Sequence, residues 1–343
     1  MIKPPLFKLS RKKLQKQFDQ LSQLADVVSY SAKTNYIVAS ILEGMTSCDF
    51  SVHSIDVVKQ FSDCKRVWYF AQGWDETKIQ KLIELGVDKF VVDNKPDLEK
   101  IKNYVSDKPI KINLLLRMRL KEHTIHTGKY YAYGFPSNDI NTLIPTLKKL
   151  EQINKLGIHF HRKTQNVSEW SLKKELVDTL DSGLWSMLDV VNIGGGIPVQ
   201  YKNFQSNVLP NIFEQVKELK TLLTEKKIKM IVECGRFLAA PCITLEVGIL
   251  NIYDNNIIVN ASVYNASMDT FIANTRLEIE GEDDSYDNYT VKGMTPCSLD
   301  IFRYKVGLNK PKKGEVLTFL NAGAYTFSTD FCGLKKIKTI VQK

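Results

Sequence analysis

The chain has 343 residues, of which 43% are hydrophobic and 25% are charged, a composition typical of a globular protein that is not embedded in a membrane. Its net charge of +9 comes from Lys and Arg runs with acidic residues between them, which argues against nucleic-acid binding. No apolar run reaches the roughly 18 residues of a membrane span, and the N-terminus lacks the features of a signal peptide. We therefore expect a cytoplasmic protein with no membrane partner. Its six scattered cysteines are expected to be free thiols rather than disulfides or metal ligands.

The first two thirds of the chain alternate strand and helix patterns. A short strand at residues 5–9 precedes a helix that Ser10 caps, and a second strand then leads to Lys33. Further strands are expected at residues 48–52, 66–70, 89–92, 112–116, 157–160, 190–193 and 229–232, with helices at 37–43, 54–62, 75–85, 95–104, 138–155, 168–180 and 211–224. About eight such units, without GxGxxG after the first strand, favour an α/β fold with a closed (β/α)8 barrel over an open sheet.

The pattern changes after about residue 240. Strands are expected at residues 243–252, 257–264, 289–292, 316–319 and 337–341, without helices between them. This predicts a C-terminal antiparallel β domain. We expect the barrel to span residues 9–240 and the β domain residues 241–343, with residues 1–8 added to it.

The active site of a (β/α)8 barrel lies at the C-terminal ends of its strands. The polar or glycine residues expected there are Lys33, Asp49, Arg117, His161, Gly194, Gly195, Gly196, Glu233 and Arg236. From its own segment, Lys33 is either a lysine that extends its charge to the surface or an amine that forms a Schiff base with a carbonyl.

The other candidates also leave two interpretations open. The glycine run suits a phosphate or makes a tight turn. His161 stacks on a planar ring or only makes a hydrogen bond, and Thr164 offers a hydroxyl to a phosphate. Glu233 faces a protonated heteroaromatic nitrogen, or pairs with Arg236 three residues later.

Three residues of the C-terminal domain are also candidates. Cys297 is either a thiol that donates a proton in the reaction or an inert cysteine. Tyr325 reaches a phosphate or packs, and Asp300 could bind a distal amine of a substrate. Nothing in their own segments decides between these alternatives.

Together these segments resemble the fold-type III PLP-dependent decarboxylases of the alanine-racemase fold, which act on ornithine, arginine, lysine or diaminopimelate. Five motifs carry the resemblance: Tyr30 to Asn35, His159 to Gln165, Asn192 to Pro198, Glu233 to Arg236, and Gly323 to Tyr325. The resemblance covers nearly the whole chain.

The resemblance implies a role for each candidate. Lys33 forms the Schiff base with pyridoxal 5′-phosphate, His161 stacks on its ring, and Glu233 keeps the ring nitrogen protonated. The phosphate ligands are Gly194, Gly195, Gly196, Thr164, Arg236 and Tyr325. Asp49 and Arg117 lie near the cofactor. Cys297 falls near a thiol that, in the family, protonates the product across a homodimer.

The sequence departs from the family at several positions. Arg162 and Lys163 replace an apolar residue and a glycine, and Cys297 lies one residue later than the family's cysteine. Either the loop shifts to restore the thiol, or Cys297 takes the place of a substrate-binding residue. These changes affect the expected substrate more than the reaction. We expect α-decarboxylation of ornithine, lysine or arginine to the corresponding amine. The alternatives are a diaminopimelate decarboxylase, an amino-acid racemase, which the carboxylate of Glu233 disfavours, and a non-catalytic, decarboxylase-like regulatory protein.

Overall fold

A computed structural model describes residues 2–120, 133–204 and 207–342 of the chain. The chain divides into two compact units. The barrel unit comprises Asp19–Ile197 and Val208–Cys234, and the sheet unit comprises Met1–Phe18, Pro198–Asn207 and Gly235–Lys343. Residues 235–240, which the sequence pattern assigned to the barrel, therefore group with the sheet unit.

The barrel unit is a closed barrel of eight parallel strands. In order around the barrel these are β2 (Val27–Ser31), β3 (Asp49–Val52), β4 (Val67–Phe70), β5 (Lys89–Val92), β6 (Ile112–Arg117), β7 (Ile153–His159), β8 (Val190–Asn192) and β9 (Lys229–Cys234). Buried apolar side chains of these strands, including Trp68, Phe70 and Leu115, form one cluster. The expected (β/α)8 barrel is confirmed.

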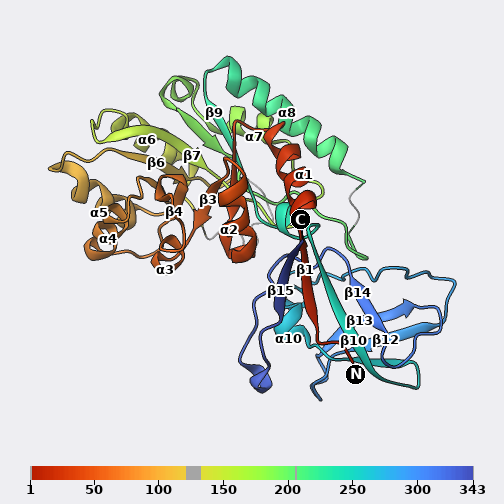
Figure 1. Cartoon of the computed structure of the whole chain (residues 1–343). Coiled ribbons are helices and arrows are strands. Elements are labelled where there is room, and N and C mark those ends of the chain that lie inside the picture. Colours follow the sequence, from red (N-terminus) through yellow and green to blue (C-terminus); the bar gives the residue numbers. More distant parts are fainter. Residues whose placement is uncertain (1, 121–132, 205–206, 343) are drawn as a thin grey trace. The chain divides into compact units, whose positions relative to one another are not determined.

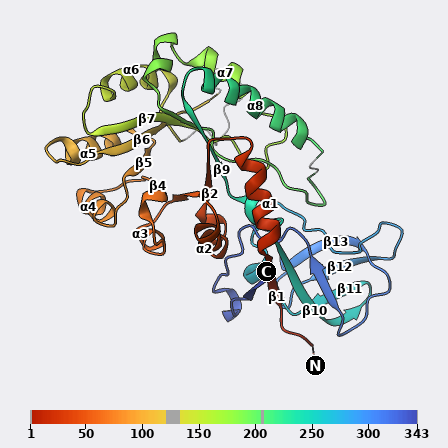
Figure 2. The same cartoon turned by 45° about the horizontal axis from the view of Figure 1, so that its top comes forward.

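Helices follow the barrel strands and lie on their outer side (Figures 1 and 2). They are α2 (Tyr36–Met45), α3 (Ile55–Val58), α4 (Glu76–Glu84), α5 (Lys95–Ser106), α6 (Ser137–Leu147), α7 (Leu172–Thr179) and α8 (Leu209–Glu225), with short 3₁₀ helices η1 (Ala32–Thr34), η2 (Cys64–Arg66) and η4 (Ser182–Met187). The residues of α1 (Arg11–Ser22) are divided between the two units. Helix α3 is shorter than expected because the backbone N–H groups of Ser62 and Asp63 bind the Glu43 carboxylate at 2.7 and 3.1 Å.

The sheet unit contains a seven-stranded sheet. Its strand order is β13 (Ile301–Gly307), β12 (Asn288–Lys292), β11 (Asn256–Val259), β10 (Ile243–Tyr253), β1 (Leu6–Ser10) and β15 (Lys338–Gln342), and β14 (Val316–Phe319) also pairs with β10. Strand β1 belongs to this sheet, as expected. The sheet is mostly rather than wholly antiparallel, since β1 pairs with β15 and β11 with β12 in parallel.

Short helices interrupt the sheet unit where the sequence predicted only strands and loops. They are α9 (Arg236–Ala239), α10 (Val263–Ala266), α11 (Asp269–Ile272) and the 3₁₀ helix η5 (Phe331–Gly333). The strand expected at 257–264 ends at Val259 because Ser262 and Asn265 form a capping box that starts α10. Over the described ranges, no helix is long and apolar enough to cross a membrane.

Candidate active site

Lys33 lies in η1, directly beyond the C-terminal end of β2. Its neighbours Ala32 and Thr34 are buried while Lys33 is exposed. The Asn35 side chain caps α2 by accepting bonds from the next helical N–H groups, and the Tyr30 hydroxyl donates to the Asn35 carbonyl at 3.1 Å. These bonds fix the turn, so the amine of Lys33 projects from a rigid strand end. Among the described residues, no hydrogen bond or salt bridge joins Lys33.

Arg117 and His159 end the neighbouring strands β6 and β7, where they pair in register. Burial lowers the pKa of Arg117, against the opposing charges of Asp93 and Glu233. His159 is 1% exposed, and neither of its ring nitrogens has a hydrogen-bond partner in the described part of the chain. Burial also lowers the pKa of His159, so this imidazole is neutral.

Glu233 extends from β9 with a side chain that is 11% exposed. Its Oε2 accepts a hydrogen bond from the Asn192 amide at 3.2 Å and lies 3.4 Å from His159 Nε2. Burial alone would raise the pKa of Glu233, but His159 and the nearby His161 and His53 outweigh it and lower the pKa to about 2. The carboxylate is therefore ionised. Within the described ranges, its Oε1 makes no hydrogen bond.

The glycine run follows β8 and admits no side chain. A Cβ at Gly194, Gly195 or Gly196 would lie 2.3, 2.3 or 2.4 Å from a backbone carbonyl oxygen. Gly194 and Gly196 also have φ of +68° and +108°, which favours glycine. The N–H of Gly195 donates to His161 Nδ1 over a long 3.3 Å. The N–H of Gly194 instead donates to Asn192 Oδ1 at 2.9 Å, so the weakly held N–H of this loop is that of Gly195.

His161 lies on the same rim, two residues beyond β7, and is exposed. Desolvation by the surrounding protein lowers its pKa to about 4, against the charge of Glu233. Thr164 follows on the same loop and is also exposed. The residues between them are held by acidic partners: Lys163 and Arg162 bind Glu169 at 2.8 and 3.3 Å. The basic pair that departs from the family pattern therefore fixes the loop.

Asp49 does not lie where the sequence predicted. It is the first residue of β3, at the N-terminal end of the strand, away from the rim that carries Lys33. Its Oδ2 accepts bonds from Lys89 Nζ at 2.8 Å and Trp68 Nε1 at 3.0 Å. The expected position beside the cofactor is wrong, because the apolar segment around Asp49 begins a strand there rather than ending one.

Arg236 and Tyr325 belong to the sheet unit. Arg236 is 6% exposed and makes a bidentate ion pair with Asp269. Its Nη1 also donates a hydrogen bond to the Tyr201 hydroxyl at 3.1 Å. The Arg236 guanidinium lies 5.2 Å from the centre of the Tyr325 ring. Burial would lower the pKa of Arg236, but Asp269 raises it. The charge of Arg236 is thus balanced within its own unit, and phosphate binding by Arg236 and Tyr325 stays a prediction.

Cys297 and Asp300 lie on one loop of the sheet unit and differ in exposure. The Cys297 thiol is 3.2 Å from the Tyr264 hydroxyl, whose hydrogen bond lowers the pKa of Cys297. Asp300 is 1% exposed. Its oxygens accept bonds from Val263 N at 2.9 Å, Thr295 N at 3.1 Å and Thr295 Oγ1 at 2.6 Å. The expectation that Asp300 binds a substrate amine is therefore wrong, because its carboxylate holds two loops together.

His53 was missed in the sequence. It directly follows β3 and is exposed at the same barrel end as Lys33. Its ring centre lies 5.1 Å from that of Phe70, which in turn lies 5.0 Å from that of His159. A usable signal was available: the last register pair of β2 and β3 is Ser31–Ser51, so a residue two positions beyond Ser51 falls beside Lys33.

The chain matches the family described as "Pyridoxal-dependent decarboxylase, pyridoxal binding domain" over residues 11–240. It belongs to this family.

Three known proteins illustrate the range of relatives. A 2-[(L-alanin-3-ylcarbamoyl)methyl]-2-hydroxybutanedioate decarboxylase of Staphylococcus aureus is 23% identical over 78% of this chain and 74% of its own. A diaminopimelate decarboxylase of Bacteroides thetaiotaomicron is 22% identical over 76% of this chain and 72% of its own. The crystal structure of a lysine/ornithine decarboxylase from Vibrio vulnificus, complexed with putrescine, has a TM-score of 0.77 at 21% identity, covering 98% and 94% of the two chains.

The barrel of this decarboxylase fits pyridoxal phosphate, the family's cofactor. The glycine cradle leaves no room for side chains, as close backbone binding of a phosphate needs. The ionised Glu233 keeps one oxygen available for a protonated ring nitrogen. The buried Nδ1 of His159 also makes no hydrogen bond in the described part of the chain. Among the described residues, no cluster of acidic, cysteine and histidine side chains could hold a metal ion.

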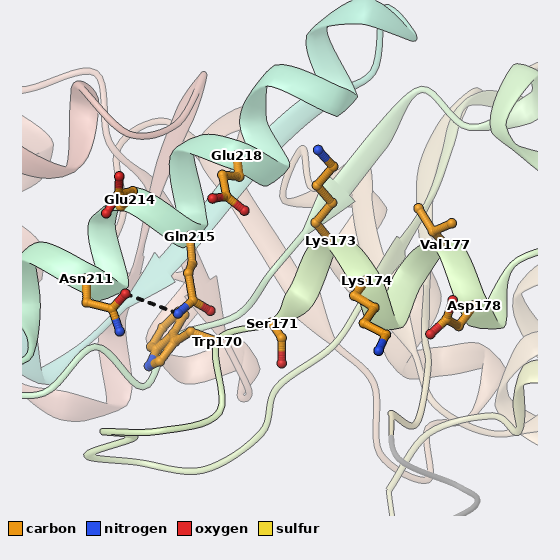
Figure 3. Close-up of a pocket in the computed structure, with 10 residues that line it drawn as sticks. All are labelled: Trp170, Ser171, Lys173, Lys174, Val177, Asp178, Asn211, Glu214, Gln215 and Glu218. Atoms are coloured by element: carbon orange, nitrogen blue, oxygen red, sulfur yellow. Dashed lines mark hydrogen bonds between the residues drawn. The ribbon is translucent and has the colours of Figure 1, made fainter.

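A cavity of about 480 Å³ lies elsewhere in the decarboxylase, on the outer side of the barrel between α7 and α8 (Figure 3). It is lined by Trp170, Ser171, Lys173, Lys174, Val177, Asp178, Asn211, Glu214, Gln215 and Glu218. None of the predicted site residues lines it.

Proposed function

We propose that the chain removes the α-carboxylate of an L-amino acid with a basic group at its far end, with ornithine, lysine and arginine as the first candidates. One observation carries this proposal. Lys33 and the glycine cradle follow β2 and β8, Glu233 lies in the last two residues of β9, and all three are presented at one rim of the barrel. An exposed amine, an ionised carboxylate and a glycine loop with a weakly held N–H at Gly195 suit the amine-binding carbon, the ring nitrogen and the phosphate of pyridoxal phosphate.

Pyridoxal phosphate, when bound, supplies a ring that accepts the electron pair left behind as CO2 departs. Lys33 provides the amine that attaches to the cofactor's carbonyl carbon. Glu233 Oε1 holds the proton on the pyridine nitrogen. The N–H groups of the glycine cradle and the Thr164 hydroxyl bind the phosphate.

Two further side chains orient the bound molecule. The neutral imidazole of His161 would cover one face of the bound ring. Arg117 contributes positive charge at the rim, where it favours an anionic ligand. Both residues follow barrel strands whose register is fixed, so their positions do not depend on the ligand.

A diaminopimelate decarboxylase is the second candidate. Asp300, the acidic residue expected to bind a distal ammonium, is saturated by Val263 and Thr295. Asp300 is therefore no reason to prefer a purely basic far end to one that also carries a carboxylate. A racemase is disfavoured, because a carboxylate at the ring nitrogen promotes electron withdrawal into the ring.

We also propose a homodimer, in which Cys297 would give a proton to the carbon that has lost CO2 in the partner subunit's site. This rests on the resemblance and on the lowered pKa of Cys297 beside Tyr264. Sedimentation velocity over a dilution series tests the assembly. Full activity in a species that sediments as a monomer would contradict it.

The reaction is tested with the purified chain and pyridoxal phosphate. Release of CO2 and the amine product are measured with ornithine, lysine, arginine and meso-diaminopimelate. Binding of the cofactor is followed by its visible absorbance, with Lys33→Ala as the test and Lys59→Ala, an exposed lysine of the same unit, as the matched control. The proposal fails if the unaltered chain binds no cofactor, or if it yields a D-amino acid without CO2.

A further inference from the structure

His53 and Lys33 follow adjacent strands at equivalent positions. Ser31 of β2 pairs with Ser51 of β3, and Lys33 and His53 each lie two residues further along. Both side chains are exposed. Within the described ranges, the ring nitrogens of His53 make no hydrogen bond, so they are available to a ligand that Lys33 holds.

The surroundings of His53 keep its imidazole neutral. Desolvation and then the positive charge of Lys33 lower the pKa of His53 to about 4, against the opposing charge of Glu233. The ring packs beside Phe70 at 5.1 Å between centres, which limits its rotation. A neutral imidazole offers one N–H donor and one acceptor nitrogen. His53 is therefore a pre-positioned hydrogen-bonding group that adds no third cation beside Lys33 and Arg117.

The strand order determines which side of the cofactor His53 can reach. Around the barrel, β2 lies between β9 and β3, and β8 lies beyond β9. The glycine cradle follows β8 and Lys33 follows β2, so His53 is on the opposite side of Lys33 from the cradle. On pyridoxal phosphate, the carbon that binds lysine lies between the carbon with the phosphate arm and the carbon with the ring hydroxyl. If the cradle holds the phosphate and Lys33 the neighbouring ring substituent, the ring hydroxyl would lie on the side of Lys33 away from the cradle, where His53 follows β3.

We propose that His53 is a cofactor-binding residue that donates a hydrogen bond to the ring hydroxyl oxygen of pyridoxal phosphate. This inference rests on the proposed function and adds a contact to it. A donor at this oxygen favours its anionic form, and the charge on this oxygen sets the visible absorbance of the bound cofactor. His53 thereby tunes the cofactor without taking part in bond breaking.

The test uses full-length His53→Ala, His53→Gln and Asp56→Asn. Gln restores a neutral donor, and Asp56 is an exposed residue of α3 that serves as the control. Dissociation constants for pyridoxal phosphate and absorbance spectra between pH 6 and 9 are measured for each. We expect His53→Ala to weaken cofactor binding about fivefold, the effect of one lost neutral hydrogen bond. We also expect its absorbance band to move to shorter wavelength. His53→Gln should recover most of both effects, and Asp56→Asn should match the unaltered chain.

The outcomes separate this inference from the proposed function. If the unaltered chain binds no cofactor, the proposed function fails. If it binds the cofactor and decarboxylates, but His53→Ala keeps the same affinity and the same spectrum, only the role of His53 is overturned. A loss that Gln does not recover would also overturn it, since the hydrogen bond would then not be the cause.

Discussion

Charged groups lie at the barrel rim and in a cluster of the sheet unit formed by Arg236, Asp269 and Tyr201. The two regions differ in how these groups are paired. Arg236 forms a bidentate ion pair with Asp269 and also donates a hydrogen bond to the Tyr201 hydroxyl. At the rim, by contrast, Glu233 and His159 keep polar atoms that have no partner in the described part of the chain.

This difference separates structural from functional polar groups. A buried polar atom without a partner costs roughly 1–3 kcal/mol. A ligand that supplies the missing partner removes this cost. A saturated cluster stabilises its own unit and has less to offer a ligand. Four substitutions test this distinction.

Lys33→Ala should have the largest effect. We expect the rate of decarboxylation to fall about 10³-fold or more, because no other described amine lies at this strand end. The change should leave the free energy of unfolding almost unaltered, since Lys33 is exposed. Steady-state kinetics and urea unfolding measure the two quantities. A large loss of stability would place Lys33 among the structural residues.

Asp269→Ala should act on stability instead. It leaves the buried Arg236 charge uncompensated, so we expect the free energy of unfolding to fall by about 3–5 kcal/mol. The double variant Arg236→Met/Asp269→Leu removes both charges and should recover much of this loss. Urea unfolding checks both. If the single variant loses less than about 1 kcal/mol, the cluster is not a structural element of the sheet unit.

Glu233→Gln should slow the reaction by about 10²-fold, because a neutral amide cannot hold the proton on the ring nitrogen. The fall should appear in kcat rather than in KM. Glu225→Gln, at the exposed C-terminal end of α8, is the matched control. An unchanged kcat in Glu233→Gln would remove Glu233 from the cofactor site.

Acidification should lower the free energy of unfolding gradually, through the histidines at the barrel rim. His53 and His161 have pKa values of about 4 in the folded chain, below the ordinary 6.5. The unfolded chain therefore binds more protons between pH 6.5 and 4, and the free energy of unfolding should fall as the pH falls through this window. Urea unfolding without added cofactor at several pH values measures the slope. His161→Gln should flatten it, and an equal slope in this variant would show that other groups titrate.

The fold was readable from the sequence because the barrel strands are continuous apolar runs separated by amphipathic helices. The same periodicity placed Lys33, Arg117, His161 and Glu233, since each ends or follows such a run. The prediction failed for Asp49, because the apolar run around it does not reveal which of its residues begins the strand and which ends it. The strand begins at Asp49, and its partners Lys89 and Trp68 come from other strands.

Other parts of the site depended on tertiary contacts that a single sequence does not contain. The saturation of Asp300 arises from main-chain groups at Val263 and Thr295. The lowered pKa of His53 comes first from desolvation by the folded chain and then from the charge of Lys33, which the register of β2 and β3 brings close. Asp269 becomes the partner of Arg236 only through the fold of the sheet unit.

The crowding around the glycine run has a consequence for protein engineering. At each of the three positions a backbone carbonyl oxygen already occupies the space of a Cβ, so every substitution there requires the main chain to move. A mutant library aimed at new substrates should hold Gly194, Gly195 and Gly196 constant. Its diversity belongs at exposed rim positions that make no proposed contact with the cofactor, where a side chain can change without a shift of the main chain.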